Sequence, residues 1–191
     1  NHFIICGYGR MGAVIASELG EQKIPFIVIE KNGEKVERIR EQRMYCIHGD
    51  ATLDDILVSA SVENAKGIAV ALNTDQDNLF VTMTIRSLNS EAFLLSRCAK
   101  DQNKSKLIRS GANKVINPYV AGGHRMVEML LRPEITDSVS VTTPNDDNLD
   151  LNIDEISINK IPSYVGKTIK DTKIRDIYDL IIVCVIKSDK N

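Results

Sequence analysis

Three glycines near the start of the chain have the spacing of a phosphate-binding turn. Gly7, Gly9 and Gly12 form a G-x-G-x-x-G pattern directly after an apolar run typical of a buried strand. In a strand–turn–helix unit the first glycine makes the tight turn, the second lets the backbone approach a pyrophosphate, and the third lets the helix lie close to the strand. The helix N-terminus adds about half a positive charge there. The pattern predicts a site for the phosphates of a nucleotide.

An acidic residue lies where the ribose of such a nucleotide is expected. A helix over residues 11–20 and a second strand over residues 26–29 follow the turn, and Glu30 comes 18 residues after Gly12. A carboxylate at this spacing accepts hydrogen bonds from ribose hydroxyls and repels a 2′-phosphate. Glu30 therefore favours NAD over NADP, a preference that Lys31 weakens. The alternative is that Glu30 only ends a strand in solvent.

Other side chains are expected at the same edge of the sheet. Arg10 could pair with a phosphate oxygen or be a solvated surface residue. Asp50 could accept from an adenine amino group or cap the next helix. Arg97 ends a strand that faces the crevice, and its side chain is expected either to pair with a phosphate or to contact a lid. The predicted nucleotide-binding residues are Gly7, Tyr8, Gly9, Arg10, Met11, Gly12, Glu30, Lys31, Asp50, Ala51, Leu72 and Arg97.

These residues require an alternating α/β fold to position them. Strand and helix patterns alternate over the first 130 residues, which predicts a Rossmann-type, doubly wound parallel sheet of order 3-2-1-4-5-6. Its later strands are expected at residues 45–48, 67–72, 92–97 and 114–117. Between them we expect helices at 33–43, at about 53–60 with Leu53, Ile56, Leu57 and Ala60 buried, at 75–88, and at 103–110.

The pattern changes after residue 118. Residues 119–131 form a helix that is apolar almost all round, which predicts burial against more than one body. Strands are expected at 138–143, 151–158 and 180–186, with extended chain at 161–167 and a short helix at 169–174. The predicted domains are a nucleotide-binding lobe (1–118), a connecting helix (119–136) and a partial α+β subdomain (137–191). We expect the chain to be a segment of a larger protein.

Composition argues against several other classes of protein. The net charge is −2 and no basic stretch stands out, so nucleic acid is not an expected partner. The four cysteines and three histidines are scattered, without the spacing of metal ligands. No catalytic His–Asp pair is evident, and Tyr164 and Lys167 are three residues apart rather than the four of a Ser-Tyr-Lys enzyme. A Rossmann oxidoreductase is therefore the weaker alternative.

Taken together, these motifs resemble an RCK domain, the regulator of potassium conductance found on prokaryotic potassium channels and Trk/Ktr transporter subunits. The resemblance rests on the glycine turn with Glu30 and on residues 49–52, 74–79, 111–119, 122–126 and 131–133. The last three blocks are absent from ordinary dehydrogenases. Residues 161–186 resemble the first half of the family's C-terminal (TrkA-C) subdomain.

The resemblance implies a regulatory function and no catalysis. It implies an adenine-nucleotide ligand, NAD(H), AMP, ADP or ATP, and a crossover helix at 119–131 that forms a homodimer within an octameric gating ring. It places the domain on the cytoplasmic face of a potassium channel, with a separate transporter subunit as the alternative. In calcium-gated members acidic residues occupy the positions of Ala71, Ser96 and Cys98, so calcium gating at that site is not expected here.

Overall fold

The computed structural model describes residues 2–131, 135–142, 150–156, 162–174 and 182. Residues 1–124 form one compact unit and residues 125–191 a second. The candidate site lies in the first unit, which contains the whole of the parallel sheet.

Six parallel strands form the sheet of the first unit, in the order β3-β2-β1-β4-β5-β6. They are β1 (Phe3–Cys6), β2 (Phe26–Glu30), β3 (Cys46–His48), β4 (Gly67–Val70), β5 (Phe93–Arg97) and β6 (Lys114–Ile116). This order confirms the predicted Rossmann-type fold. Because the strand order reverses between β1 and β4, their carboxyl ends flank the crevice in which such sheets bind ligands.

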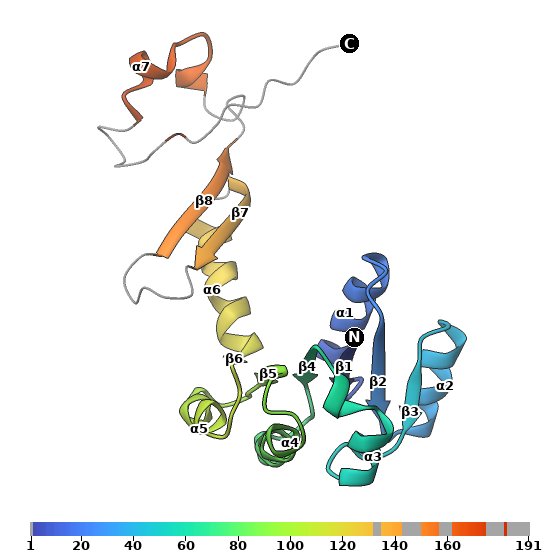
Figure 1. The fold of residues 1–191 in the computed structure, drawn as a ribbon. Coiled ribbons are helices and arrows are strands. Elements are labelled where there is room, and N and C mark those ends of the chain that lie inside the picture. Colours follow the sequence, from blue (N-terminus) through green and yellow to red (C-terminus); the bar gives the residue numbers. More distant parts are fainter. Residues whose placement is uncertain (1, 132–134, 143–149, 157–161, 175–181, 183–191) are drawn as a thin grey trace. The chain divides into compact units, whose positions relative to one another are not determined.

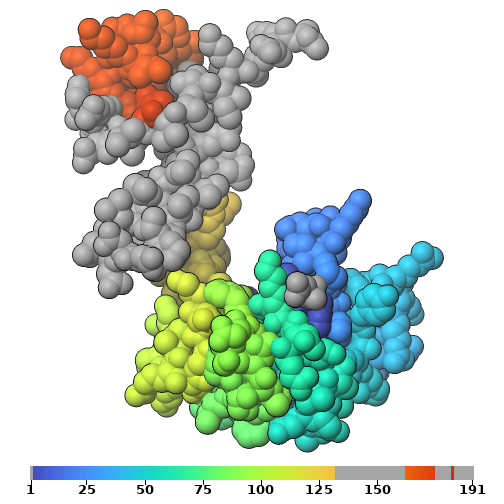
Figure 2. Space-filling view, in the orientation of Figure 1, coloured from blue at the N-terminus to red at the C-terminus, as the bar shows by residue number. Residues whose placement is uncertain are grey.

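Helices cover both faces of this sheet (Figure 1). One face carries α1 (Arg10–Glu21) and α2 (Gly33–Glu41). The other carries α3 (Asp54–Ser59), α4 (Asp75–Leu88) and α5 (Lys104–Arg109). In the space-filling view the segments of α3 and α4 lie side by side as one continuous surface (Figure 2). The 3₁₀ turns η1 (Val62–Asn64) and η2 (Asp101–Asn103) complete the connections, and α6 (Pro118–Leu131) follows β6.

Side-chain alternation along β1 builds the core on both faces of the sheet. Ile4 packs in the cluster that includes Leu57 of α3 and Ile85 of α4. Ile5, the next residue, packs in the cluster with Ala16 of α1. These side chains are fully buried, and burying each large aliphatic one contributes about 1.5–3 kcal/mol. The core therefore fixes the two helix layers around the strand that leads into the glycine turn.

Local signals explain most of the element boundaries. The Thr74 hydroxyl accepts from the Asp77 N–H and caps α4. Gly111, at a φ of +107°, follows the end of α5. Pro118 opens α6 one residue earlier than predicted, because proline fits the first position of a helix. Leu53 was expected in the buried stripe of α3, but it precedes that helix and is 53% exposed.

The second unit contains an antiparallel pair, β7 (Ile135–Thr142) and β8 (Asp150–Ile156), and a one-turn helix, α7 (Ile169–Thr172). A 3₁₀ turn, η4 (Pro162–Tyr164), stands where extended chain was expected, because proline and serine favour a turn. Apart from residue 182, the strand predicted at 180–186 lies outside the described residues. Among the helices that are described, none has the length and apolarity needed to cross a bilayer.

Candidate nucleotide site

Two glycines fix the shape of the turn between β1 and α1. Gly7 has a φ of +95°, and its N–H donates to the Ile29 carbonyl at 2.8 Å. A Cβ built on Gly12 would lie 1.9 Å from the Gly7 carbonyl oxygen, so no other residue fits there. These contacts are those of a tight turn followed by a helix packed close against its strand.

The N-terminus of α1 is open to an anion. Gly9 is its N-cap residue, and no side chain among the described residues caps this helix. The first helical hydrogen bond of the turn runs from the Ala13 N–H to the Gly9 carbonyl, at 2.9 Å. The N–H groups before Ala13 therefore point out of the helix end without a partner four residues back. The first turn also contains no acidic residue, so the helix dipole is not neutralised there.

Glu30 joins this turn to the neighbouring strand. The residue is 7% exposed, and its Oε2 accepts from the Tyr8 N–H at 2.7 Å. Its Oε1 accepts from the Asn32 N–H at 2.8 Å, and the Lys35 ammonium lies 3.9 Å from Oε2. A carboxylate offers about four acceptor positions, so Glu30 retains capacity for ribose hydroxyls while it holds the glycine turn in place.

Asp50 is held in one orientation by its neighbours. Its Oδ1 accepts from the Thr52 N–H at 3.0 Å and the Thr52 hydroxyl at 2.8 Å, and the Lys31 ammonium lies 3.3 Å from Oδ2. The Thr52 hydrogen bonds, together with Lys31, lower the pKa of Asp50. Asp50 is thus an ionised acceptor at the rim of the crevice at neutral pH.

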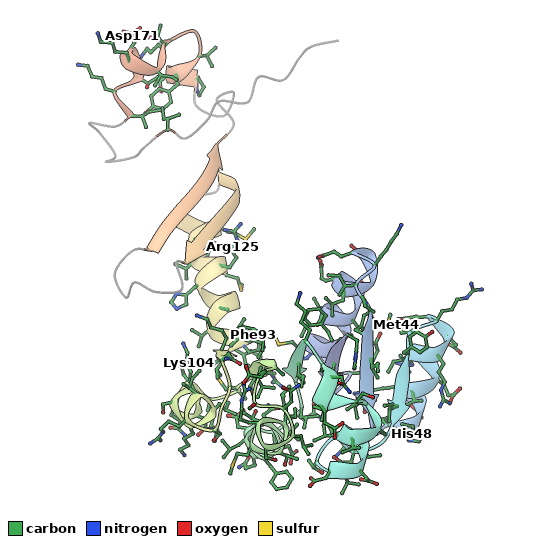
Figure 3. The ribbon with its side chains drawn as sticks, in the orientation of Figure 1. Met44, His48, Phe93, Lys104, Arg125 and Asp171 are labelled. Atoms are coloured by element: carbon green, nitrogen blue, oxygen red, sulfur yellow. The ribbon has the colours of Figure 1, made fainter. Side chains whose placement is uncertain are left out.

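A cleft of about 170 Å³ opens between these groups. Figure 3 labels Met44 and His48 just before and at the end of β3, and the cleft lies at the His48 end, where Gly49 and Asp50 follow. Its lining comes from three segments and one residue of α4: Ile29, Glu30 and Lys31; Gly49, Asp50, Ala51 and Thr52; Leu72, Asn73 and Thr74; and Asp77.

The cleft adjoins the open end of α1 at two points. Glu30 lines the cleft and bonds to the backbone of the glycine turn. The side chain of Asn73, also in the lining, lies 3.7 Å from the position of a Cβ on Gly9. A molecule in the cleft can therefore extend a negatively charged end to the N-terminus of α1.

Hydrogen bonds within the chain tie β4 to β5. The Arg97 guanidinium donates to the Leu72 carbonyl at 2.9 Å. Asn78, almost fully buried, donates to the carbonyls of Leu72 and Arg97 and accepts from the Leu72 N–H. Arg97 was predicted to face the crevice, and the structure gives it a partner in the turn that carries Leu72.

The loop after β5 is bonded to the start of α4. The Asp75 carboxylate accepts from the Ala99 N–H at 2.7 Å, the Lys100 N–H at 3.1 Å and the Asn103 amide at 2.8 Å. Partial burial raises the pKa of Asp75, but the hydrogen bonds from Asn103, Ala99 and Lys100, with the charge of Arg97, outweigh it and the pKa is lowered. Asp75 therefore neutralises the end of α4 and holds the β5 loop against it.

Arg10 contacts the first turn of α6. Its guanidinium donates to the Tyr119 hydroxyl at 3.0 Å. Asn117 fixes that turn by accepting from the Tyr119 and Val120 N–H groups. The glycine turn is therefore in direct contact with the base of the helix that leaves the first unit.

Five of the predicted residues line the cleft: Glu30, Lys31, Asp50, Ala51 and Leu72. The glycine turn, Gly7 to Gly12, lies beside the cleft and not in its lining. The other lining residues were not among the predicted nucleotide-binding residues: Ile29, Gly49, Thr52, Asn73, Thr74 and Asp77. The T-x-x-D spacing of Thr74 and Asp77 is a capping signal that marks the start of α4 at this edge, whereas no local pattern identifies Thr52.

No group of three or more metal-ligating side chains occurs among the residues that the structure describes. Ala71 and Cys98 are buried, and burial raises the pKa of the Cys98 thiol. Cys6 is completely buried, which raises its pKa to about 12, so its thiol is unreactive core.

The chain is similar in sequence and fold to known proteins. The chain is 34% identical over 192 aligned residues to "Potassium channel protein 1" of Methanocaldococcus jannaschii, an alignment that covers all of this chain and 57% of that protein. The chain therefore spans about half the length of the curated relatives it matches. The names of both relatives describe potassium channel proteins.

Two solved structures of the GsuK channel have the same fold. The structure bound to ADP is 27% identical, with a TM-score of 0.58 over 70% of this chain and 35% of that one. The structure bound to NAD is 23% identical, with a TM-score of 0.61 over 93% of this chain and 30% of that one. At this identity the comparison shows a shared fold only. Residues 3–118 match the TrkA-N domain, and with its sheet order, glycine turn and channel homologues the chain belongs to that family.

Proposed function

We propose that this domain binds an adenine nucleotide and thereby regulates a potassium channel. The observation that carries the proposal is the uncapped, acid-free N-terminus of α1 beside a cleft that is lined by Glu30 and Asp50. Helix N-terminal N–H groups stabilise phosphate oxygens, and Arg10 adds a positive charge. Glu30 accepts from the ribose hydroxyls and Asp50 from the adenine amino group. Arg97 acts through Leu72, by holding that edge of the cleft.

The apolar surface of α6 supports a homodimer. None of its described residues is buried, and Met126, Leu130 and Leu131 are 66%, 79% and 75% exposed. The sheet face opposite α4 and α5 is also open, with Phe93 52% and Ile116 38% exposed. Apolar patches of this kind mark protein–protein interfaces. A second copy of the chain covers both, and such dimers assemble into the octameric ring of a channel.

The contact between Arg10 and Tyr119 provides a route from ligand to pore. A phosphate at the α1 N-terminus competes with the Tyr119 hydroxyl for the Arg10 guanidinium, and so changes the restraint on α6. Moving a gate from mostly closed to mostly open requires about 5.5 kcal/mol of differential binding. Shared over about eight sites this is about 0.7 kcal/mol each, which corresponds to about a threefold preference in affinity.

The experiment is ADP titration by isothermal calorimetry of the wild-type chain and of Gly9→Asp. The new carboxylate caps α1 and repels phosphate, so ADP affinity falls about a hundredfold or more. Gly20→Asp is the matched control, because it adds the same charge at the other end of α1, and it leaves ADP affinity within about threefold of wild type. Unchanged ADP affinity in Gly9→Asp refutes the phosphate assignment.

A flux measurement tests the regulatory part of the proposal. The full-length protein in liposomes, with this domain on the inner face of the membrane as proposed, conducts potassium in response to ADP, and Gly9→Asp removes the response. If the chain instead belongs to a separate transporter subunit, potassium flux responds to ADP only when the membrane partner is also in the liposomes. Turnover of NADH with any offered substrate by the chain alone favours the oxidoreductase alternative.

A further inference from the structure

We infer that the surface around α5 docks on an anionic lipid surface, and so holds the first unit against the inner leaflet of a membrane. The inference goes beyond the nucleotide site. It rests on the proposed function only in that the domain belongs to a membrane protein. It concerns five exposed side chains, here called the α5 cations: Lys100, Lys104, Lys106, Arg109 and Lys114.

The segment from Arg97 to Lys114 has a charge opposite to that of the whole chain. It contains six cations and one acid, Asp101, and so has a net charge of +5, whereas the net charge of the chain is −2. No two of these cations are adjacent in the sequence, so no local run of charge marks them. The fold gathers them, because α5 and the edge strand β6 lie at one end of the sheet (Figure 1).

The α5 cations have no ion-pair partner in the part of the chain that the structure describes. The four ion pairs found there lie in α2, beside the cleft and in α6. Arg109 donates through Nε to the Ser105 carbonyl at 3.4 Å, and this bond does not neutralise its charge. Arg97, the sixth cation, is half-buried and bonded to the Leu72 carbonyl, so it is not part of this surface.

Contacts beneath the surface hold the α5 cations in place. Leu107 of α5 is 1% exposed, so this side chain anchors the helix in the core. On one side of α5, the Lys100 N–H donates to the Asp75 carboxylate. On the other, the Arg86 guanidinium donates twice to the Gly111 carbonyl, at 3.1 and 2.8 Å. A surface held in this way loses little conformational entropy when it binds a partner.

The charged face of α2 provides a comparison within the same molecule. It also carries cations, but three glutamates alternate with them, and Arg40 pairs with Glu37 at 2.8 Å. Charges of alternating sign are typical of a solvated helix face. In contrast, α5 contains three cations and no acid between Lys104 and Arg109. A surface of one sign attracts a partner of the opposite sign.

The composition of this surface favours a lipid bilayer over nucleic acid as the partner. Four of the five α5 cations are lysines, which are point charges without the planar fork that arginine presents to phosphates and bases. The sequence from Arg97 to Lys114 contains no aromatic residue on which a base could stack. Ile108, which is 42% exposed, adds an apolar side chain beside the charges, as the boundary of headgroups and acyl chains requires.

The attraction is weak for one cation and appreciable for several. A lysine or arginine near an anionic leaflet strengthens binding about fivefold, over a range of about 8 Å at physiological ionic strength. Three cations within that range give about a hundredfold. A domain tethered to a membrane protein is always near the bilayer, so this attraction suffices to orient it. The response to nucleotide then depends on the anionic lipid content of the membrane.

The experiment is co-sedimentation of the 191-residue chain with two kinds of vesicle. One kind is phosphatidylcholine alone, and the other is an equimolar mixture of phosphatidylcholine and phosphatidylserine. We expect the affinity for the mixed vesicles to be about a hundredfold higher, and this difference to disappear at about 1 M salt, where the Debye length is about 3 Å. Equal binding to both kinds, or a difference that persists at high salt, overturns the inference.

Charge reversal tests whether the α5 surface makes the contact. Lys106→Glu with Arg109→Glu changes two exposed cations that are three residues apart on α5, and the affinity for mixed vesicles should fall at least about twentyfold. Arg38→Glu with Arg43→Glu is the matched control. It makes the same change of charge in and after α2, on the other face of the sheet, and should leave the affinity within about threefold. Equal losses in two double variants that unfold at the same denaturant concentration as the wild type overturn the inference.

Two further measurements distinguish other ligands. A DNA duplex that binds more tightly than the mixed vesicles, and that loses affinity in the α5 double variant, assigns the surface to nucleic acid and overturns the inference. ADP titration reports on the nucleotide site separately. A chain that binds ADP but not the mixed vesicles overturns this inference alone, whereas one that binds the vesicles but not ADP overturns only the proposed nucleotide function.

Discussion

Two helices that begin at the same edge of the sheet differ in the capping and the charge of their N-termini. α1 follows β1 and α4 follows β4, and these strands are neighbours. α1 opens with a Gly9 cap and Gly12 at its third position, without an acid in the first turn. α4 opens with a Thr74 cap and with Asp75 and Asp77 at its first and third positions.

The difference between α1 and α4 teaches where an anion can bind. Both helix ends carry the same dipole, but α4 neutralises its own with two carboxylates and a hydroxyl, whereas α1 leaves its N–H groups open. The topology of the fold offers two equivalent sites. The side chains at the first three helical positions close one and keep the other.

Gly12→Ala should have the largest effect on this arrangement. Its Cβ would lie 1.9 Å from the Gly7 carbonyl oxygen, so α1 must move away from β1. We expect the free energy of unfolding to fall by about 4 kcal/mol, measured by chemical denaturation. Gly20→Ala is the control in the same helix: a Cβ there meets no described atom within 4 Å, and alanine should stabilise the helix by up to about 1 kcal/mol. Equal stability of the two variants would contradict the close packing of the turn.

Asp75→Ala should weaken the contact between the N-terminus of α4 and the loop after β5. It removes the acceptor for the Ala99 and Lys100 N–H groups, and we expect a loss of about 1–2 kcal/mol in the free energy of unfolding. Hydrogen exchange at the Ala99 and Lys100 amides should accelerate, while exchange in β1 changes only with global stability. Protection that persists at both amides would show that Asp75 does not hold the loop.

Tyr119→Phe should have a smaller effect, on phosphate binding at the N-terminus of α1. Loss of the hydroxyl frees Arg10 for phosphate, and ADP affinity should rise about threefold, by calorimetry. Adenosine affinity should not change, because adenosine has no phosphate. In an Arg10→Met background the substitution should do nothing for ADP, and a persisting gain there would disprove the coupling.

The smallest expected effect is the loss of folding stability at acid pH. The pKa values of Asp50 and Asp75 are lowered in the folded state, so their contribution to stability is complete above the ordinary carboxyl pKa of about 4 and is lost as pH falls through the lowered values. Stability should therefore decrease below about pH 4. Asp75→Asn should make this decrease shallower, as measured by urea denaturation at a series of pH values; an unchanged slope would exclude Asp75 as a contributor.

Sequence patterns predicted most strands and helices because short-range signals set them, and the alternation of these elements predicted the sheet order. Apolar alternation, the glycine turn, the Thr74 cap and Gly111 each act within a few residues. The prediction that Leu53 is buried in a helix was wrong. It rested on apolar periodicity alone, whereas α3 begins only at Asp54. The candidate residues at strand ends could be named for the same reason, since parallel strands bring their carboxyl ends to one edge.

The sequence by itself determined the strand, the glycine turn and the helix at the start of this chain, and so predicted a phosphate site there. Only the tertiary structure decided which partners its charged residues take: Glu30 bonds to Tyr8, Arg97 to Leu72, and Arg10 to Tyr119, 109 residues away. The reason is physical. Backbone conformation is set by neighbours along the chain, whereas a long charged side chain bonds to whichever polar group packing brings within reach.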